Sequence, residues 1–438
     1  QASDSNKNIT GIGLMYRYGY FDQSISMFGD QIAENQPQKY TNLPLLPVRD
    51  TDEKWMIISL ALPGRTLYAK VWKLKIGRIR LYLLDTDIEE NAMEDRAITH
   101  HLYGGDWNNR FKQELLLGVG GVRLMHQLNM NPAIYHLNEG HAAFAGVERL
   151  RHMVENEGMD FSVALEIVRA TTLFTTHTPV PAGHDTFSED ILRTYIPHYP
   201  DRLNITWNDF VNLGKFKKGD PSEKFSMSVL AANISQQMNG VSKIHGRVTR
   251  EMFRELYPGY YPEELHIGHV TNGIHFKSWT AKNFQSFYEN KLGKNLSEPE
   301  TWNKIYNVSD AVLWRQRVKA KNDFVKFLRE KYIGDLEKRQ ESPQLIYKSE
   351  EGIIEDALYV GFARRFATYK RAHLLFTDAG KLSKLLNDPD RPMRFVFAGK
   401  AHPNDKPGQD LIKKIIEISK QPEFIGKNIL KISNKPLN

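Results

Sequence analysis

The sequence predicts an α/β fold in which parallel sheets are covered by helices. Short apolar segments with the character of strands alternate with helical patterns between residues 133 and 176, and again between residues 358 and 419. Strands that alternate with helices in this way are typical of parallel sheets joined by crossover helices. The chain has 438 residues, which is too long for one compact core. We therefore expect two or three domains.

The individual elements follow from the periodicity of apolar residues. Alternation with a period of two predicts strands over residues 56–64 and 69–85. Further short apolar runs predict strands over residues 133–137, 171–176, 358–362 and 393–399. Helical patterns cover residues 108–128, 142–155, 161–170, 312–332, 369–386 and 408–419. Residues 334–355 are polar and predict an irregular loop, and a domain boundary is expected near residues 272–279.

Composition limits the possible classes of function. The net charge is +7, but 59 Lys and Arg are interspersed with 52 Asp and Glu. Such a distribution favours a local anion site over a nucleic-acid-binding face. The absence of cysteine excludes disulfides, thiolate catalysis and thiolate metal sites. The sequence shows no apolar run of membrane-spanning length and no signal-peptide pattern at its start, which is Gln1 rather than a methionine, so we expect a trimmed start.

The strongest chemical signal is VGFARRFATYKRAHLL at residues 360–375. An apolar strand runs into Arg364 and Arg365, and the predicted helix that follows carries Lys370 and Arg371 in its first turn. Ligands of α/β sheets bind at the carboxyl ends of strands, where helix N-termini favour anions. Arginine and lysine side chains both suit phosphate. The sequence therefore predicts an anion site, with a solvated basic turn as the alternative.

The motif HLNEGH at residues 136–141 follows another predicted strand. A metal site at His136, Glu139 and His141 is disfavoured, because the motif crosses a strand-to-helix turn rather than occupying one helix face. Two other interpretations stay open. Asn138 could cap the helix with Glu139 near its dipole, or the three residue types could bind sugar hydroxyls.

One further strand end and one loop carry candidate residues. His177 lies at the start of THTPVPAGHDTF, although a lone histidine is more often structural than catalytic. The segment TNGIHFKSW joins the Asn272-Gly273 turn to Trp279, and an Asn-Gly pair alone indicates only a turn. Phosphate loops of the Walker type, dinucleotide-binding fingerprints and nucleophile elbows do not occur in the sequence.

The order of these motifs is more specific than any one of them. It runs YRYGYF, YLLDTD, LYGGD with RFKQE, HLNEGHAAF, TTHTPVPAGHDTF, NGV, TNGIHFKSW, GFARRFATYKR and FAGKAHPNDKPGQ. This series resembles the α-glucan (glycogen, starch and maltodextrin) phosphorylases, in particular their shorter bacterial and archaeal branch. The resemblance extends from Thr10 to about Lys427.

The resemblance implies a GT-B type glycosyltransferase, in which two Rossmann-like domains face each other across a cleft. The N-terminal glucan-binding domain would comprise residues 1–271 and be incomplete at its start. The C-terminal cofactor- and phosphate-binding domain would comprise residues 272–438 and be truncated. The implied reaction is retaining phosphorolysis of the non-reducing end of an α-1,4-glucan by inorganic phosphate, which gives α-D-glucose 1-phosphate. A cytoplasmic enzyme, homodimeric when full length and without nucleic-acid or membrane partners, is expected.

Several residues of the first part match family positions with a role at the sugar. His177 matches the histidine whose backbone carbonyl lies beside the reacting sugar, where it would stabilise developing positive charge. Asn272 matches the asparagine that hydrogen-bonds the glucose. Glu139 and His141 match an Asp and a His that support the site, and Asp106 lies in the position of the acidic loop that gates it.

The second part matches the family's phosphate-binding positions. Arg365 and Lys370 match cations that bind the substrate and cofactor phosphates, Arg364 matches a neighbouring cation, and Trp279 matches a tryptophan beside the cofactor. In this family the cofactor is pyridoxal 5′-phosphate, held by a lysine, and its phosphate exchanges a proton with the substrate phosphate.

The sequence also departs from the family pattern. The E-A-S-G-T-x-x-M-K stretch that carries the cofactor lysine does not occur, nor does the glycine-rich loop that precedes YRYGYF. Residues 27–30 (MFGD) replace the Gly-Trp that the family often has, and ILKISNKPLN ends the sequence in place of a strand and E-N-Y. We therefore expect no covalent cofactor and little or no phosphorolysis from this polypeptide.

Two alternative functions follow from these departures. The chain could be a non-catalytic glucan- or phosphate-binding fragment, or a nucleotide-sugar glycosyltransferase on the same fold. Missing C-terminal strands would leave a sheet edge and apolar helix faces uncovered, so aggregation or a covering partner is expected.

Overall fold

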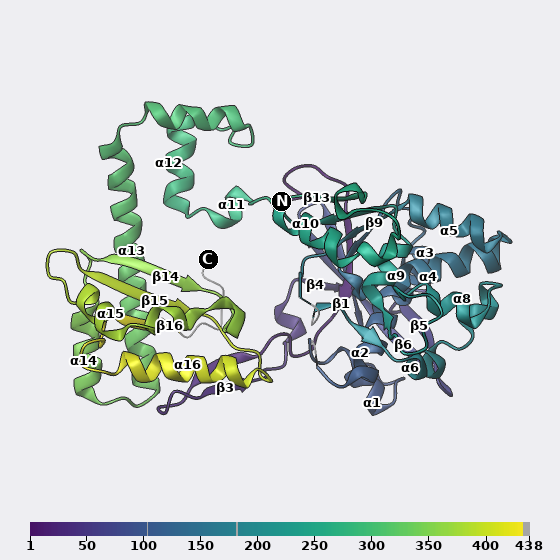
Figure 1. Cartoon of the computed structure of the whole chain (residues 1–438), viewed down its shortest axis with the longest axis horizontal. Helices are drawn as coiled ribbons and strands as arrows, with labels where there is room; N and C mark the ends of the chain where they lie inside the picture. Colours follow the sequence, from purple (N-terminus) through teal and green to yellow (C-terminus); the bar gives the residue numbers. More distant parts are fainter. Residues whose placement is uncertain (103, 181–182, 432–438) are drawn as a thin grey trace. The chain divides into compact units, whose positions relative to one another are not determined.

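The protein has a mixed α/β structure that contains parallel sheets, as the sequence predicts. A computed structural model describes residues 1–102, 104–180 and 183–431 (Figure 1). The chain divides into two compact units, which are described separately. Unit 1 consists of Gln1–Tyr20 and Pro37–Gly273, and unit 2 consists of Phe21–Gln36 and the chain from Ile274 onward.

One sheet of unit 1 has five strands. It is formed by β1 (Thr10–Leu14), β4 (Leu45–Pro47), β5 (Ile57–Leu62), β6 (Arg65–Ile76) and β7 (Ile79–Asp85). The order is β1-β7-β6-β4, with β5 also paired to β6, and only the β1–β7 pair is parallel. The predicted strand over residues 69–85 is two strands joined by a turn at Gly77, which has a φ of 61°. Alternate residues of β5 are buried, which explains the period-two pattern.

The second sheet of unit 1 is wholly parallel. It is formed by β8 (Tyr135–Asn138), β9 (Thr172–Thr175), β12 (Gln237–Gly240) and β13 (Ile267–His269), in the order β13-β12-β9-β8. A small antiparallel pair, β10 (Thr186–Phe187) and β11 (Phe225–Ser226), lies outside it. Because all four strands run in one direction, their carboxyl ends meet at one edge.

Helices supply the rest of unit 1. They are α1 (Met93–Arg96), α2 (Trp107–Leu115), α3 (Gly121–Gln127), α4 (Phe144–Arg151), α5 (Phe161–Ala170), α6 (Glu189–Tyr195), α7 (Tyr199–Arg202), α8 (Trp207–Asn212), α9 (Met227–Asn233) and α10 (Lys243–Met252). Large buried aromatic side chains, among them Phe111, Phe144 and Phe174, connect α2, α4 and β9 in one core.

The helix predicted over residues 108–128 is present but is not uniform. Asp106 caps α2 by accepting a hydrogen bond from Asn109 N, and a π-helical turn at Leu116–Gly120 joins α2 to α3. Gly118 lies in this turn, and a Cβ there would be only 2.7 Å from Ala145 N and 2.8 Å from Phe144 C. The close approach of the π-helical turn to the start of α4 therefore depends on a glycine at this position.

Unit 2 contains a parallel sheet of three strands, in the order β14 (Leu358–Ala363), β15 (Met393–Ala398) and β16 (Asn428–Lys431). Its helices are α11 (Phe276–Trp279), α12 (Lys282–Leu292), α13 (Asp310–Lys338), α14 (Pro343–Gly352), α15 (Ala379–Leu386) and α16 (Lys406–Ser419). The expected open edge concerns family strands that would follow residue 438, so that expectation stays a prediction. The atypical end of the sequence, residues 432–438, lies outside the described residues.

Two sequence predictions for unit 2 are wrong. Residues 334–355 are not an irregular loop, because α13 continues to Lys338 and α14 begins at Pro343 after its cap Ser342. The helix predicted over residues 369–386 is interrupted: two short 3-10 helices cover Thr368–Lys370 and Ala372–Phe376, and α15 begins only at Ala379. Arg371 adopts a left-handed backbone with φ of 61°, which ends the first turn, so Lys370 and Arg371 do not lie in the first turn of an α-helix.

A hairpin from the N-terminal region belongs to unit 2, which the sequence analysis did not anticipate. Strands β2 (Asp22–Ile25) and β3 (Gln31–Glu34) lie beside α16 (Figure 1). Gln31 exchanges two hydrogen bonds with the backbone of Ala401, at 3.0 and 2.9 Å, and Asp30 pairs with Lys413 at 2.8 Å. The unusual residues 27–30 therefore form the turn of a hairpin that packs on α16.

Among the helices that the structure describes, none is both long and apolar enough to cross a bilayer.

The contact at Gly118 gives a first testable prediction. Gly118→Ala should lower the free energy of unfolding by about 1–3 kcal/mol, because the new methyl group meets backbone atoms that cannot yield. Urea unfolding followed by circular dichroism measures the effect. Gly334→Ala is the matched control: this helical glycine has open space at its Cβ, and the change should be neutral or stabilising by about 0.4–1 kcal/mol. Equal effects at the two positions would contradict the packing argument.

Candidate active site

The carboxyl edge of the parallel sheet in unit 1 carries three of the predicted site residues. Glu139 directly follows β8, His177 follows β9 by two residues, and Asn272 follows β13 by three. Strands β8 and β9 are neighbours, whereas β13 lies on the far side of β12. Asn272 is exposed, and its backbone N–H donates to Val241 O at 3.4 Å, just beyond the end of β12. The topology thus brings these residues to one edge, and their roles stay predictions.

Glu139 connects the ends of β8 and β9 directly. Its Oε1 accepts a hydrogen bond from His177 N at 2.5 Å, and its Oε2 accepts one from Thr176 Oγ1 at 3.4 Å. His184 lies on the other side of the same loop, with Nε2 3.0 Å from Thr178 O and Nδ1 2.7 Å from Ser228 Oγ. The backbone on both sides of His177 is therefore held by side chains.

The backbone of Glu139 is strained. Its φ of 68° and ψ of 176° belong to a region that is essentially restricted to glycine. Such a conformation costs about 1–3 kcal/mol and is kept only where the surrounding contacts impose it. The hydrogen bond from His177 N to the Glu139 carboxylate is one such contact. The strain at Glu139 therefore lowers local stability while this contact fixes the loop. Asn138 does not cap the following turn with its side chain, because residue 139 takes the N-cap position without a side-chain hydrogen bond.

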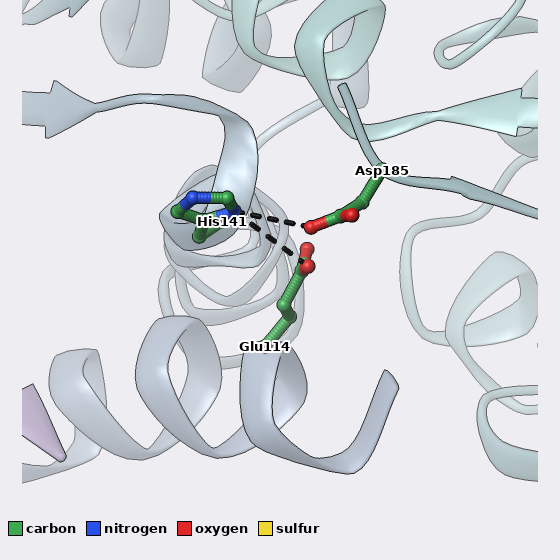
Figure 2. Close-up of side chains that lie close together, drawn as sticks. All are labelled: Glu114, His141 and Asp185. Carbon is green, nitrogen blue, oxygen red and sulfur yellow. Dashed lines mark ion pairs between the residues drawn. The ribbon is translucent and has the colours of Figure 1, made fainter. Parts of the chain in front are cut away.

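A cluster of four charged or titratable side chains lies behind this edge, and we call it the Asp185 cluster. It consists of Arg110 and Glu114 from α2, His141 from the turn after β8, and Asp185 from the loop after β9. Asp185 Oδ2 accepts from Arg110 Nε at 2.9 Å and from Arg110 Nη2 at 2.7 Å, and it lies 3.2 Å from His141 Nδ1. Figure 2 shows Glu114, His141 and Asp185 pointing toward one another.

Glu114 is the most buried member of the cluster, with 1% of its side chain exposed. Its Oε1 lies 3.0 Å from Arg110 Nε and 3.8 Å from His141 Nδ1, but within the described residues neither carboxyl oxygen has a partner in hydrogen-bond geometry. Burial raises the pKa of Glu114 to about 8, with a further contribution from the nearby Asp185 carboxylate. At neutral pH this carboxyl group is therefore mainly protonated.

His141 and Asp185 shift in opposite directions. Burial alone would lower the pKa of His141, but its contacts with Asp185 and Glu114 outweigh burial and raise the pKa to about 9. Burial would raise the pKa of Asp185, but His141, Glu114 and Arg110 together hold that pKa well below its usual range. Arg110 Nη2 lies 2.6 Å from His141 Nδ1, which is a hydrogen bond only for an unprotonated nitrogen, because arginine only donates. The raised pKa favours a protonated Nδ1 that faces Asp185. One oxygen of Asp185 is then shared by two adjacent cations, Arg110 and His141.

Glu148 on α4 is also fully buried, but its partners give the opposite result. It lies 2.9 Å from Arg123 Nε and 3.0 Å from Arg151 Nη2, and it accepts a hydrogen bond from Tyr199 OH at 2.8 Å. Burial would raise the pKa of Glu148, but the two guanidinium groups outweigh it and lower the pKa. A cavity of about 300 Å³ adjoins Arg123, Arg151 and Tyr199, and it is lined by none of the predicted site residues.

The Asp185 cluster is also the one group in the described part of the chain whose geometry would allow a metal ion, through Glu114, His141 and Asp185. Arg110 argues against a metal there, because its guanidinium lies within hydrogen-bond distance of both His141 and Asp185 and already supplies the compensating charge. His136, the other metal candidate of the sequence, instead lies 2.8 Å from Thr175 Oγ1 through Nε2.

Sequence reasoning missed Arg110, Glu114 and Asp185 as members of a site. Arg110 and Glu114 lie four positions apart in RFKQE, a spacing that places both on one helix face. Asp185 ends the segment THTPVPAGHD. Both segments are part of the predicted motif series, so a signal was present, but nothing in either segment indicates the partner in the other.

The predicted residues of unit 2 form a separate group. Arg364 and Arg365 are exposed directly after β14, and the buried Phe366 anchors this loop through its N–H, which donates to Lys400 O at 3.0 Å. Lys370 Nζ lies 4.6 Å from the centre of the Tyr369 ring. In residues 1–102, 104–180 and 183–431, no ion pair is found for Arg364, Arg365 or Lys370. Trp279 is 74% exposed at the end of α11.

Comparison with known proteins agrees with the motif series. The sequence model of the carbohydrate phosphorylase family matches residues 121–424. The maltodextrin phosphorylase of Thermococcus litoralis is 39% identical over 430 residues, which cover 97% of this chain and 50% of that protein. A glycogen phosphorylase of Mycobacterium tuberculosis is 37% identical, with 96% and 50% covered, and one of Aquifex aeolicus is 32% identical, with 98% and 62% covered.

The chain therefore belongs to the carbohydrate phosphorylase family. It spans about half the length of the first two of these relatives and somewhat more of the third.

The strain at Glu139 gives a second prediction. Glu139→Ala and Glu139→Gly both remove the acceptor of the His177 N–H, but glycine tolerates the left-handed backbone. The glycine variant should therefore be more stable than the alanine variant by about 1–3 kcal/mol, measured by urea unfolding. At Glu166, on the exposed face of α5, the order should reverse by about 1 kcal/mol. An alanine variant that is more stable than the glycine variant at both positions would show that the backbone of residue 139 is unstrained.

The two buried glutamates give a third prediction. A raised folded-state pKa contributes stability that is present at low pH and is lost as pH rises, so Glu114 should make the free energy of unfolding fall between about pH 5 and 8. His141 should add a fall between about pH 6.5 and 9. Glu114→Gln should reduce the slope by up to about 1.4 kcal/mol per pH unit in the first interval.

Urea unfolding between pH 5 and 9 measures these slopes. Glu148→Gln is the matched control: because the pKa of Glu148 is lowered, this variant should lose stability at neutral pH. An unchanged slope in Glu114→Gln would show that Glu114 is ionised throughout the interval.

Proposed function

We propose that the complete protein to which this chain belongs degrades α-1,4-glucans by retaining phosphorolysis, releasing α-D-glucose 1-phosphate from the non-reducing end. The proposal is carried by one observation: in a member of the carbohydrate phosphorylase family, Glu139, His177 and Asn272 follow strands of one parallel sheet at its carboxyl edge. Relatives of this chain are named for maltodextrin and glycogen, which supports an α-glucan as the substrate.

In this proposal unit 1 binds the sugar. Asn272 hydrogen-bonds the glucose unit, and the backbone carbonyl of His177 faces the reacting carbon, where it stabilises positive charge in the transition state. Glu139 fixes the His177 peptide through its N–H. His141 supports this loop through the Asp185 cluster. Asp106, which caps α2, belongs to the loop that gates the site.

Unit 2 would bind the phosphate groups. Arg364, Arg365 and Lys370 are close in sequence on one short irregular segment, and their charges are not compensated by carboxylates of the described chain. Arginine and lysine of this kind bind phosphate oxygens well. We further propose that the two units correspond to the Rossmann-like domains of a GT-B enzyme, with the division near residues 271–274 and the hairpin Phe21–Gln36 in the second domain. The sugar and phosphate residues would then lie on opposite sides of a cleft.

The residues present fit only part of the family cofactor. The exposed Arg364 and Arg365 and the half-buried Lys370 suit the phosphate end of pyridoxal 5′-phosphate, and Trp279 offers an exposed flat ring. The lysine motif that would hold its aldehyde does not occur in the 438 residues. When bound, the cofactor supplies a phosphate that exchanges protons with the substrate phosphate. We propose that this chain contacts the phosphate of the cofactor and forms no covalent bond with the cofactor. We also propose that the complete enzyme is cytoplasmic and homodimeric.

Sugar binding by unit 1 gives a fourth prediction. Isothermal titration calorimetry of the 438-residue chain with maltoheptaose should show saturable binding, and Asn272→Ala should weaken the affinity about tenfold through the loss of a hydrogen bond to the sugar. The exposed Asn307 of unit 2 serves as the control, and its alanine variant should bind as the unmodified chain does.

Activity assays separate the proposal from its alternatives. Release of glucose 1-phosphate from maltoheptaose and phosphate would show that this polypeptide is itself a phosphorylase. Saturable binding without turnover is the expected result for a glucan-binding portion of a longer enzyme, and turnover of ADP- or UDP-glucose would favour a nucleotide-sugar transferase. Absence of any maltoheptaose binding would contradict the proposed role of unit 1.

A further inference from the structure

The Asp185 cluster joins three segments that are far apart in the sequence. Arg110 lies on α2, whose N-cap is Asp106. His141 lies two residues after Glu139, and Asp185 ends the segment that begins at His177. Each segment therefore carries one of the predicted site residues, and two of these, Glu139 and His177, follow strands at the edge of the parallel sheet. The cluster is the place where the three segments meet.

We propose that Asp185 is a positioning residue: by compensating the charges of the adjacent Arg110 and His141, it holds together the α2, Glu139 and His177 segments. This inference rests on the proposed sugar-binding role of the edge, and it assigns to Asp185 a function through other residues rather than contact with substrate. Its support is geometric, since a single oxygen, Oδ2, accepts two hydrogen bonds from Arg110 and lies 3.2 Å from His141 Nδ1.

The backbone around Asp185 is itself anchored. Met227 N donates to Asp185 O at 3.0 Å, which attaches the loop to the start of α9. The preceding residue, His184, lies 2.7 Å from Ser228 Oγ and 3.0 Å from Thr178 O through its two ring nitrogens. The anchor therefore extends from α9 through residues 184 and 185 to the residue that follows His177.

The turn that carries His141 packs on the same part of α9. A Cβ at Gly140 would lie 2.9 Å from Ser228 N and 3.0 Å from Met227 C, so this turn lies directly against the helix start. The segments that carry His141 and Asp185 thus both pack on the start of α9, whereas Arg110 comes from a separate helix, α2. The Arg110–Asp185 contact adds a polar link between α2 and these two segments, beside the apolar packing of Phe111.

Charge explains why the contact depends on Asp185. The titratable and charged groups that face the cluster are Arg110 and Glu114 from α2, His141 after β8 and Asp185 after β9, with Tyr16 after β1 acting on Arg110. Because Glu114 is mainly protonated at neutral pH, Asp185 is the ionised carboxylate that compensates both Arg110 and His141 within the described residues. Two cations whose nitrogens lie only 2.6 Å apart do not remain together without that charge.

This arrangement predicts a pH-dependent defect. In Asp185→Asn, His141 loses the carboxylate that favours its protonated form. At pH 8 the neutral ring can then accept a hydrogen bond from Arg110 Nη2, and the segments stay joined. At pH 5.5 both side chains are cations and repel each other, so α2 and the strand-end loops should separate.

Hydrogen–deuterium exchange with mass spectrometry tests this in the 438-residue chain. Exchange of residues 172–180 in Asp185→Asn, divided by that of the unmodified chain at the same pH, should rise at least tenfold at pH 5.5 and less than threefold at pH 8. Asp185→Glu should restore protection at both pH values. Glu148→Gln, which breaks a different buried ion pair in unit 1, should not raise the ratio selectively in residues 172–180.

The outcomes separate the positioning role from general destabilisation and from the proposed function. An equal rise at both pH values, or no rise, would overturn the positioning role. Maltoheptaose affinity of Asp185→Asn, measured at the same two pH values, should follow the same order, with the larger loss at pH 5.5. If the unmodified chain binds no maltoheptaose, the proposed sugar-binding role fails, while the exchange ratios still decide the role of Asp185.

Discussion

The candidate site depends on how one partly buried negative charge is compensated. Asp185 lies between Arg110 and His141, and each of these side chains comes from a different segment of the chain. A buried carboxylate without partners is too costly to retain, and the same holds for a buried guanidinium. The contacts of Asp185 with Arg110 and His141 therefore stabilise the arrangement of all three segments at once. The strained backbone of Glu139 is one consequence, because the turn that carries it is fixed at both ends, by the His177 N–H and by the contact of His141.

The two buried glutamates show that partners, rather than burial, determine ionisation. Glu148 receives two arginines and a tyrosine hydroxyl and keeps its charge. Glu114 has one guanidinium near it, but that group is directed at Asp185, so the carboxyl group keeps its proton. This difference has a structural benefit: a neutral Glu114 leaves Asp185 without a competitor for the two cations. The helix α2 can then carry an acid and a base four residues apart without their forming a self-contained pair.

Local rules were enough to locate part of the site from the sequence. Glu139 and His177 each follow a predicted strand, and ligand-binding residues of parallel sheets follow strands. Asn272 came from the family resemblance, because strand β13 before it was not predicted. The same rules failed where a single backbone conformation decided the outcome: the left-handed Arg371 ends a turn that the apolar pattern continues through, so the helix begins only at Ala379. Polar composition concealed α14, which is set by its cap at Ser342 and by Pro343. Contacts between distant segments, such as Arg110 with Asp185 and Gln31 with Ala401, leave no local pattern at all.

The two groups of site residues reflect two ways of preparing a protein for a ligand. In unit 1, Arg110, His141 and Asp185 already contact one another, so these side chains are ordered when the unit folds rather than when a ligand binds. In unit 2, Arg364, Arg365 and Lys370 stand close in sequence on an exposed, irregular segment whose fixed point is the buried Phe366. Like charges held near one another raise the energy of the free protein, and an anion that binds them relieves that repulsion. Under the proposed function, a neutral glucan would need exact placement of hydrogen bonds at the sheet edge of unit 1, and phosphate would need the positive charge of the unit 2 segment.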